Sequence, residues 1–155
     1  MSERRLHIAV VGAGVCREPA QQVAEAVGKE IAHHQAVLVC GGLGGVMESA
    51  ARGARTAGGL VVGILPSYDA STANPWVDVV IVTGLGHARN VLVVASGDAV
   101  IALPGEHGTA SEINLALKLG RPVVALGAWE AYDDVVHADT PEQAVSLAVA
   151  AAGAR

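Results

Sequence analysis

Residues 99–112 read AVIALPGEHGTASE, an apolar run that passes through a glycine-rich turn into a helical segment. The run at 99–103 shows no polar alternation, which is typical of a strand buried on both faces of a parallel sheet. The turn holds Gly105 and Gly108, and a helix is predicted over 109–119. Strand, glycine turn and helix in this order form the repeating unit of an α/β fold.

The same alternation runs along the whole chain. It predicts a single Rossmann-like, doubly wound α/β domain over residues 1–155, with a mainly parallel sheet and helices on both faces. Residues 66–75 form one long polar loop that is interpreted as a flap over a site. Buried strands are expected at 6–11, 36–40, 60–65, 77–82, 99–103 and 122–126, and helices at 19–34, 45–57, 87–96, 109–119 and 140–152.

Composition narrows the class of protein. Hydrophobic residues make up 52% of the 155 and charged residues only 16%, an apolar excess that favours a homodimer or homotetramer. The net charge of −5 and the absence of a basic stripe argue against nucleic acid as a partner. No run is long enough to span a membrane and no signal peptide is evident, so a cytoplasmic protein without a membrane partner is expected. Cys16 and Cys40 have no zinc or CxxC spacing and are interpreted as reduced thiols.

Two glycine turns follow the first two strands. Gly12 and Gly14 suggest a dinucleotide fingerprint, but Arg17 stands where its third glycine belongs and no acid follows the second strand. That turn is interpreted as a tight βα turn whose N–H groups help to hold a ligand. The second turn opens a helix and is predicted to contact an anionic ligand through Gly41, Gly42, Gly44, Gly45, Val46 and Met47. Glu48 is interpreted as an ordinary first-turn charge.

The segment from Pro104 to Glu112 suits a phosphate, because Gly105, Gly108 and Thr109 form a turn at a helix start. Two interpretations of Glu112 stand. Its spacing from Thr109 matches a capping box, in which it would reach back to the helix N-cap. Alternatively, it faces the ligand as a reactive carboxylate.

Residues 83–90 read TGLGHARN and place Arg89 and Asn90 after Gly84 and Gly86. An isolated arginine at a helix start is usually a surface charge. Here it precedes an apolar stretch, so it is predicted at the ligand edge of the sheet, where it pairs with Glu112 or clamps a phosphate or ribose. No second ligand at metal spacing accompanies the histidines, so neither a metal nor another cofactor is expected.

Taken in order, GGLGGVM at 41–47, TGLGHARN at 83–90 and PGEHGTASE at 104–112 resemble the Rossmann-like superfamily of the LONELY GUY proteins. These proteins were long labelled lysine decarboxylases. The superfamily also holds molybdenum-cofactor-carrier-like proteins and more distant DprA-related proteins. The resemblance spans about residues 6–126. TGLGHARN is most similar to the molybdenum-cofactor-carrier-like branch.

The resemblance implies a phosphoribohydrolase that splits a nucleoside 5′-monophosphate into free base and ribose 5-phosphate. By position, Arg89 and Glu112 match the catalytic pair of the PGGxGTxxE signature. Glu106 replaces the second glycine of that signature, and Asn90 replaces a lysine. These departures favour the alternative of a carrier or sensor that binds a phosphorylated pterin or nucleotide without chemistry. Lysine decarboxylation is rejected, because Lys29 and Lys118 both lie inside predicted helices and not at a pyridoxal phosphate site.

Overall fold

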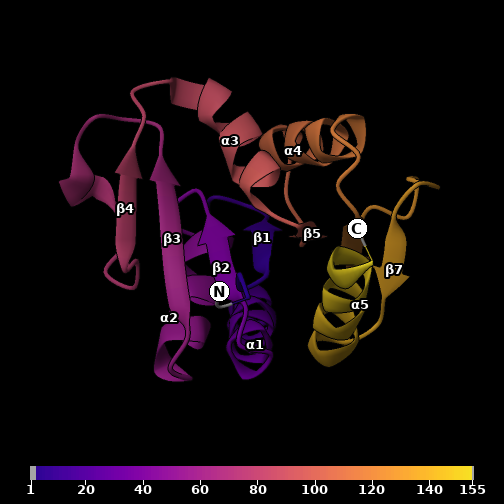
Figure 1. Ribbon diagram of the computed structural model, residues 1–155. Helices are drawn as coiled ribbons and strands as arrows, with labels where there is room; N and C mark the ends of the chain where they lie inside the picture. The colour runs from indigo at the N-terminus through magenta and orange to yellow at the C-terminus, as the bar shows by residue number, and fades with distance from the viewer. Residues whose placement is uncertain (1–2, 155) are drawn as a thin grey trace.

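The computed structural model describes residues 3–154. Within this range seven parallel strands form one sheet in the order β4-β3-β2-β1-β5-β6-β7 (Figure 1). The chain winds outward from β1 to β4, returns to β5 beside β1, and winds outward again to β7. This confirms the predicted doubly wound α/β fold. The strands are β1 (His7–Val11), β2 (Val37–Cys40), β3 (Leu60–Leu65), β4 (Val79–Val82), β5 (Ala99–Ala102), β6 (Val123–Leu126) and β7 (Val136–Ala138).

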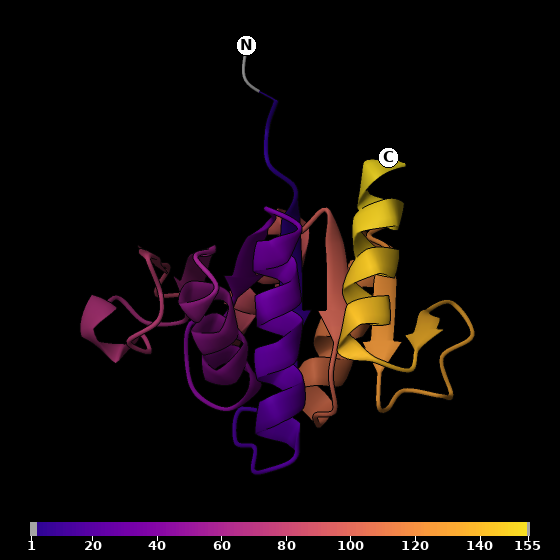
Figure 2. The same ribbon diagram turned by 90° about the horizontal axis from the view of Figure 1, so that it is seen from below.

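Helices cover both faces of the sheet. Helices α1, α2 and α5 pack on one face, and α3 and α4 cover the other (Figures 1 and 2). Side chains of β1 alternate between the two layers, with Ile8 and Val10 toward α1 and α5, and Ala9 and Val11 toward α3 and α4. The helices are α1 (Ala20–His33), α2 (Val46–Thr56), α3 (Arg89–Ser96), α4 (His107–Lys118) and α5 (Pro141–Gly153), with short 3₁₀ turns η1 (Ala70–Thr72) and η2 (Gly86–Ala88).

Strand β4 departs from the sequence prediction. Its run was expected to be buried on both faces, but Val79, Val80, Ile81 and Val82 are all exposed, by 36–45%. The prediction was wrong because β4 is an edge strand that pairs only with β3 and is not covered by the helix layers. Burial of a strand depends on its place in the sheet as well as on its own residues.

A side-chain cap marks the start of α5. Thr140 accepts a hydrogen bond from the Gln143 N–H (3.1 Å) at the start of α5, with Pro141 in the first turn, and each end of this helix lies within one residue of the predicted range 140–152. Strand β7 was not predicted, because three residues with His137 at the centre show no apolar run. Within residues 3–154 no helix is long and apolar enough to cross a membrane.

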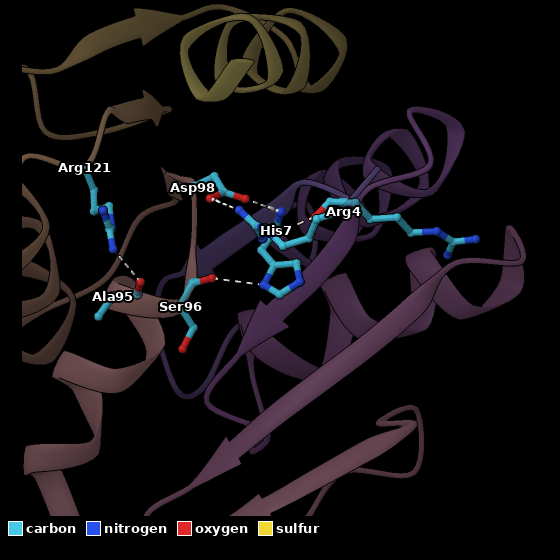
Figure 3. Close-up of polar contacts among 7 residues, drawn as sticks. Arg4, His7, Ala95, Ser96, Asp98 and Arg121 are labelled. Atoms are coloured by element: carbon cyan, nitrogen blue, oxygen red, sulfur yellow. Dashed lines mark hydrogen bonds and ion pairs between the residues drawn. The ribbon is translucent and has the colours of Figure 1, made fainter. Parts of the chain in front are cut away.

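The amino-terminal edge of the sheet is closed by polar contacts (Figure 3). Asp98 accepts hydrogen bonds from Arg4 Nη2 (2.7 Å) and from the His7 N–H (2.8 Å). Burial alone would raise the pKa of Asp98, but these two bonds and the charge of Arg4 together lower it. Arg121 Nη2 donates to the Ala95 carbonyl (2.8 Å) nearby. These contacts fix the start of β5 beside β1.

Candidate functional site

The carboxyl ends of β1, β2 and β5 meet where the winding of the sheet reverses, the place where such folds bind ligands. Backbone hydrogen bonds join the loops that leave these strands. The Ala13 N–H donates to the Pro104 carbonyl (3.0 Å), and the Val46 N–H donates to the Ala13 carbonyl (2.9 Å). The loop after β1 is therefore held between the glycine loop that opens α2 and the loop that opens α4.

A cavity of about 540 Å³ lies at this edge, and we call it the polar cavity. It falls within the volume range of about 300–1,000 Å³ that is usual for small-ligand sites. Arg89 and Asn90 of α3 and Thr109 and Glu112 of α4 all reach it, although α3 and α4 follow different strands. Its lining consists of Val10, Val11, Gly12, Ala13, Gly14, Val15, Gly41, Met47, His87, Arg89, Asn90, Glu106, Gly108, Thr109 and Glu112.

Arg89 is a buried cation, only 8% exposed. Its Nε donates to the Ile64 carbonyl (2.8 Å) and its Nη2 to the Gly41 carbonyl (3.1 Å), while Nη1 donates to Asn90 Oδ1. Arg89 thus joins α3 to the ends of β2 and β3. A guanidinium carries more N–H donors than these bonds use, so Arg89 retains donors for a ligand in the cavity.

Glu112 is largely buried and takes no part in helix capping. Helix α4 begins at His107 with Glu106 at the N-cap position, so Thr109 lies inside the first turn and the capping box does not form. Burial raises the pKa of Glu112 to about 7, and the opposing charge of Arg89 only partly offsets this. A carboxyl with a pKa near 7 is suited to give or to take a proton near neutral pH.

Two glycines allow the cavity walls to approach each other. A Cβ at Gly41 would lie 2.5 Å from Arg89 Nη2 and 2.7 Å from Met47 Sδ, so a side chain there would displace the arginine. A Cβ at Gly105 would collide with the Thr109 side chain and come within 3.0 Å of the Ala13 nitrogen. Both positions require glycine for close packing around the site.

Gly108 differs, because a Cβ built there meets nothing within 4 Å. It lies in the first turn of α4 and lines the polar cavity. The first N–H groups of a helix have no acceptor within the helix and carry its positive dipole end. A glycine at this place leaves these groups open to an anion.

The structure separates the residues predicted for the site into three groups. Gly12, Gly14, Gly41, Met47, Arg89, Asn90, Gly108, Thr109 and Glu112 line the polar cavity. Val46, Pro104 and Gly105 line a second cavity beside it. Gly42, Gly44, Gly45, Gly84 and Gly86 line neither cavity.

Among the glycines that line neither cavity, Gly45 and Gly84 allow close packing between loops. Gly45 has a φ of 67° and packs against the backbone of Ala13 and Gly14, and Gly84 packs against the ring of Tyr68. The loop at 66–75, interpreted as a flap, lines neither cavity. It is held through Asn74, which bonds to the carbonyls of Gly42 (2.8 Å) and Leu43 (2.9 Å).

Cys40 lies behind the site at the end of β2. It is fully buried, and its burial raises the pKa of the thiol to about 11. Cys40 and Cys16 are both free cysteines. The Cys40 thiol stays protonated at neutral pH and is therefore a packing residue, because the thiolate is the nucleophilic form.

The second cavity, of about 920 Å³, was not predicted from the sequence. We call it the apolar cavity. It lies beside the polar cavity at the carboxyl edge of the sheet, next to the starts of α1 and α5, and its walls include Pro19, Ala20, Val23, Leu126, Ala128 and Ala138. These residues come from segments far apart in the chain and carry no motif. The motif residues that reach this cavity are Val46, Pro104, Gly105 and Glu106, on the side that faces the polar cavity.

The fold and the site define a doubly wound α/β protein with a ligand crevice at its topological switch point. The chain belongs to the SLOG cluster4 family, whose sequence profile matches residues 5–153. This confirms the resemblance to the LONELY GUY superfamily.

Relatives come from both branches that the motifs suggested. The molybdenum cofactor binding protein of Rippkaea orientalis is 39% identical, with 96% of this chain and 98% of that chain covered and a TM-score of 0.90. The molybdenum cofactor carrier protein of Chlamydomonas reinhardtii is 34% identical, with 98% and 100% covered and a TM-score of 0.88. A cytokinin riboside 5′-monophosphate phosphoribohydrolase of Rhodococcoides fascians is 41% identical over 95 residues, which cover 59% of this chain and 48% of that protein.

Proposed function

We propose that this protein binds a phosphorylated small ligand of the nucleoside 5′-monophosphate class in the polar cavity. The open N-terminus of α4 at Gly108 and the remaining donors of Arg89 would hold the phosphate. Glu112 lies in the same cavity, where the ribose of such a ligand would be within its reach.

We further propose that the site hydrolyses the N-glycosidic bond of this ligand. The observation that carries this proposal is the position of Glu112, largely buried in the cavity and not used by the helix cap. In its ionised form Glu112 would take a proton from water as the water oxygen bonds to C1′ of the ribose. The C1′–N bond breaks with its electron pair passing to the base, which then takes up a proton. Free base and ribose 5-phosphate leave. Arg89 would position Glu112 and favour its ionised form.

To test this proposal, the protein is incubated with a panel of nucleoside 5′-monophosphates, and the free base released is measured by chromatography. Glu112→Gln should lower the rate by about 10²–10⁴-fold while ligand binding is retained, because the amide cannot accept the proton. Glu142→Gln removes an exposed carboxylate at the start of α5 and serves as the matched control. Unchanged base release by Glu112→Gln would exclude hydrolysis by this residue.

A second candidate function is carriage of a phosphorylated pterin, such as the molybdenum cofactor, or of a nucleotide, without chemistry. Asn90 favours it, because this residue replaces the lysine of the hydrolase signature and accepts a bond from Arg89 within the site. Both full-length structural relatives above carry molybdenum cofactor names. This function predicts saturable ligand binding and no base released from any monophosphate. Efficient hydrolysis of AMP would contradict it.

We also propose that the chain self-associates through β4. This strand exposes apolar side chains on both faces and leaves one row of backbone hydrogen-bonding groups unpaired at the edge of the sheet. Such an edge is a template for pairing with a second copy of the same strand. The high apolar content of the chain supports this proposal.

A further inference from the structure

The two cavities meet at one ridge. Ala13, Val15 and Glu106 line both of them, so the polar and apolar cavities open side by side at the carboxyl edge of the sheet. The ridge is held by the backbone bonds from Ala13 to the loops that open α2 and α4. A ligand that occupies the polar cavity is therefore directly next to the mouth of the apolar cavity.

The ridge carries an apolar side chain exposed to solvent. Val15 is 84% exposed although it stands between two cavities rather than on a helix surface. A ligand that crosses the ridge would cover this side chain and remove its apolar surface from water, which favours binding. A ligand confined to either cavity would leave most of Val15 exposed.

Charge distinguishes the two cavities. The ionisable groups that line only the apolar cavity are Glu130, Asp139, Arg17, His137 and the Cys16 thiol, and the Glu106 carboxylate is shared with the polar cavity. Carboxylates outnumber the cationic groups at neutral pH, so this cavity disfavours an anion and favours a group that donates hydrogen bonds. The polar cavity is also lined by two carboxyls, Glu112 and the shared Glu106, and it favours an anion through the remaining N–H donors of Arg89 and those at the start of α4.

We infer that the apolar cavity is a second compartment of the ligand site and receives the uncharged ring of a two-part ligand. The phosphorylated arm lies in the polar cavity, and the connecting atoms cross the ridge at Val15 and Glu106. The ring is a planar heterocycle with N–H donors, of the purine or pterin type, because these donors match the carboxylates at the mouth. This inference rests on the proposed function, since it assigns the phosphate to the polar cavity.

The test uses two probes that share the phosphorylated arm, ribose 5-phosphate and AMP. Binding is measured by calorimetry in the Glu112→Gln background, so that no ligand is hydrolysed during titration. Ala20→Phe places a phenyl ring in the apolar cavity, and Ala128→Phe does so from the opposite wall, in case one variant does not fold. Ala150→Phe adds the same ring at an exposed position of α5 that lines neither cavity and is the matched control.

AMP should bind at least about tenfold more tightly than ribose 5-phosphate, because its base adds contacts that the sugar phosphate lacks. Ala20→Phe and Ala128→Phe should remove most of this advantage and leave ribose 5-phosphate affinity unchanged, while Ala150→Phe should affect neither probe. Two results would refute the assignment of the apolar cavity to the ring while leaving the proposed function intact. One is equal affinity for AMP and ribose 5-phosphate. The other is an AMP affinity that neither Ala20→Phe nor Ala128→Phe lowers. If neither AMP nor ribose 5-phosphate bound to Glu112→Gln without a further substitution, the proposed function itself would be refuted.

Discussion

Replacing Glu112 by glutamine should stabilise the folded protein at alkaline pH. Burial raises the pKa of this carboxyl from 4.5 to about 7, so the folded state binds its proton more tightly than the unfolded chain does. Between these two values the folded state holds more protons, and the free energy of unfolding of the wild type therefore falls as pH rises. Below pH 4.5 the carboxyl is protonated in both states and this penalty disappears.

The size of the effect follows from the pKa difference. At about 1.4 kcal/mol for each pKa unit, the rise from 4.5 to about 7 corresponds to at most about 3.5 kcal/mol at pH 8. Glutamine keeps the size of the side chain and removes the charge. We expect Glu112→Gln to be about 1–3 kcal/mol more stable than the wild type at pH 8, which in a chain of this length raises the melting temperature by several degrees.

Urea denaturation of both proteins at pH 4.5, 6 and 8 gives the required free energies of unfolding. The difference between the two proteins isolates Glu112, because every other titrating group is common to both. Glu142→Gln, an exposed carboxylate, controls for the loss of one negative charge. A difference between Glu112→Gln and wild type that does not change with pH would refute the account of a buried, destabilising carboxylate.

Three further outcomes test other parts of the molecule. Gly108→Ala should raise helix stability by about 0.5–1 kcal/mol. It should also weaken ribose 5-phosphate binding about tenfold or more in calorimetry, because the added methyl group covers the N–H groups of α4. Gly153→Ala is the control, since a methyl group there also meets no other atom. Arg89→Lys should cost about 2–3 kcal/mol in chemical denaturation, since an ammonium cannot replace the bonds to Ile64 and Gly41. An equally stable lysine variant would show that these bonds do not hold the site. Ile81→Lys should dissociate the assembly paired through β4, as measured by sedimentation, and a wild type that sediments as a monomer would contradict that pairing.

Much of the fold was predictable because its signals are local. A short valine-rich run followed by a glycine turn predicts a strand and a helix start wherever it occurs, and Thr140 with Pro141 predicts a cap from two adjacent residues. Arg89 and Glu112 could be assigned to one edge because parallel strands bring the starts of successive helices together.

The character of the site was decided only by tertiary structure. The sequence left open whether Glu112 caps a helix or faces a ligand, and the answer depended on where α4 begins. The Arg89 guanidinium is held by carbonyls of two other strands, which no spacing encodes. The exposure of β4 follows from its outer place in the sheet.

The sequence by itself determined the α/β class and most of the strands and helices, because each depends on neighbours within a few positions. Only the tertiary structure decided the raised pKa of Glu112 and the apolar cavity next to the starts of α1 and α5. Burial and concavity arise where segments distant in the chain pack against one another, so no local pattern contains them.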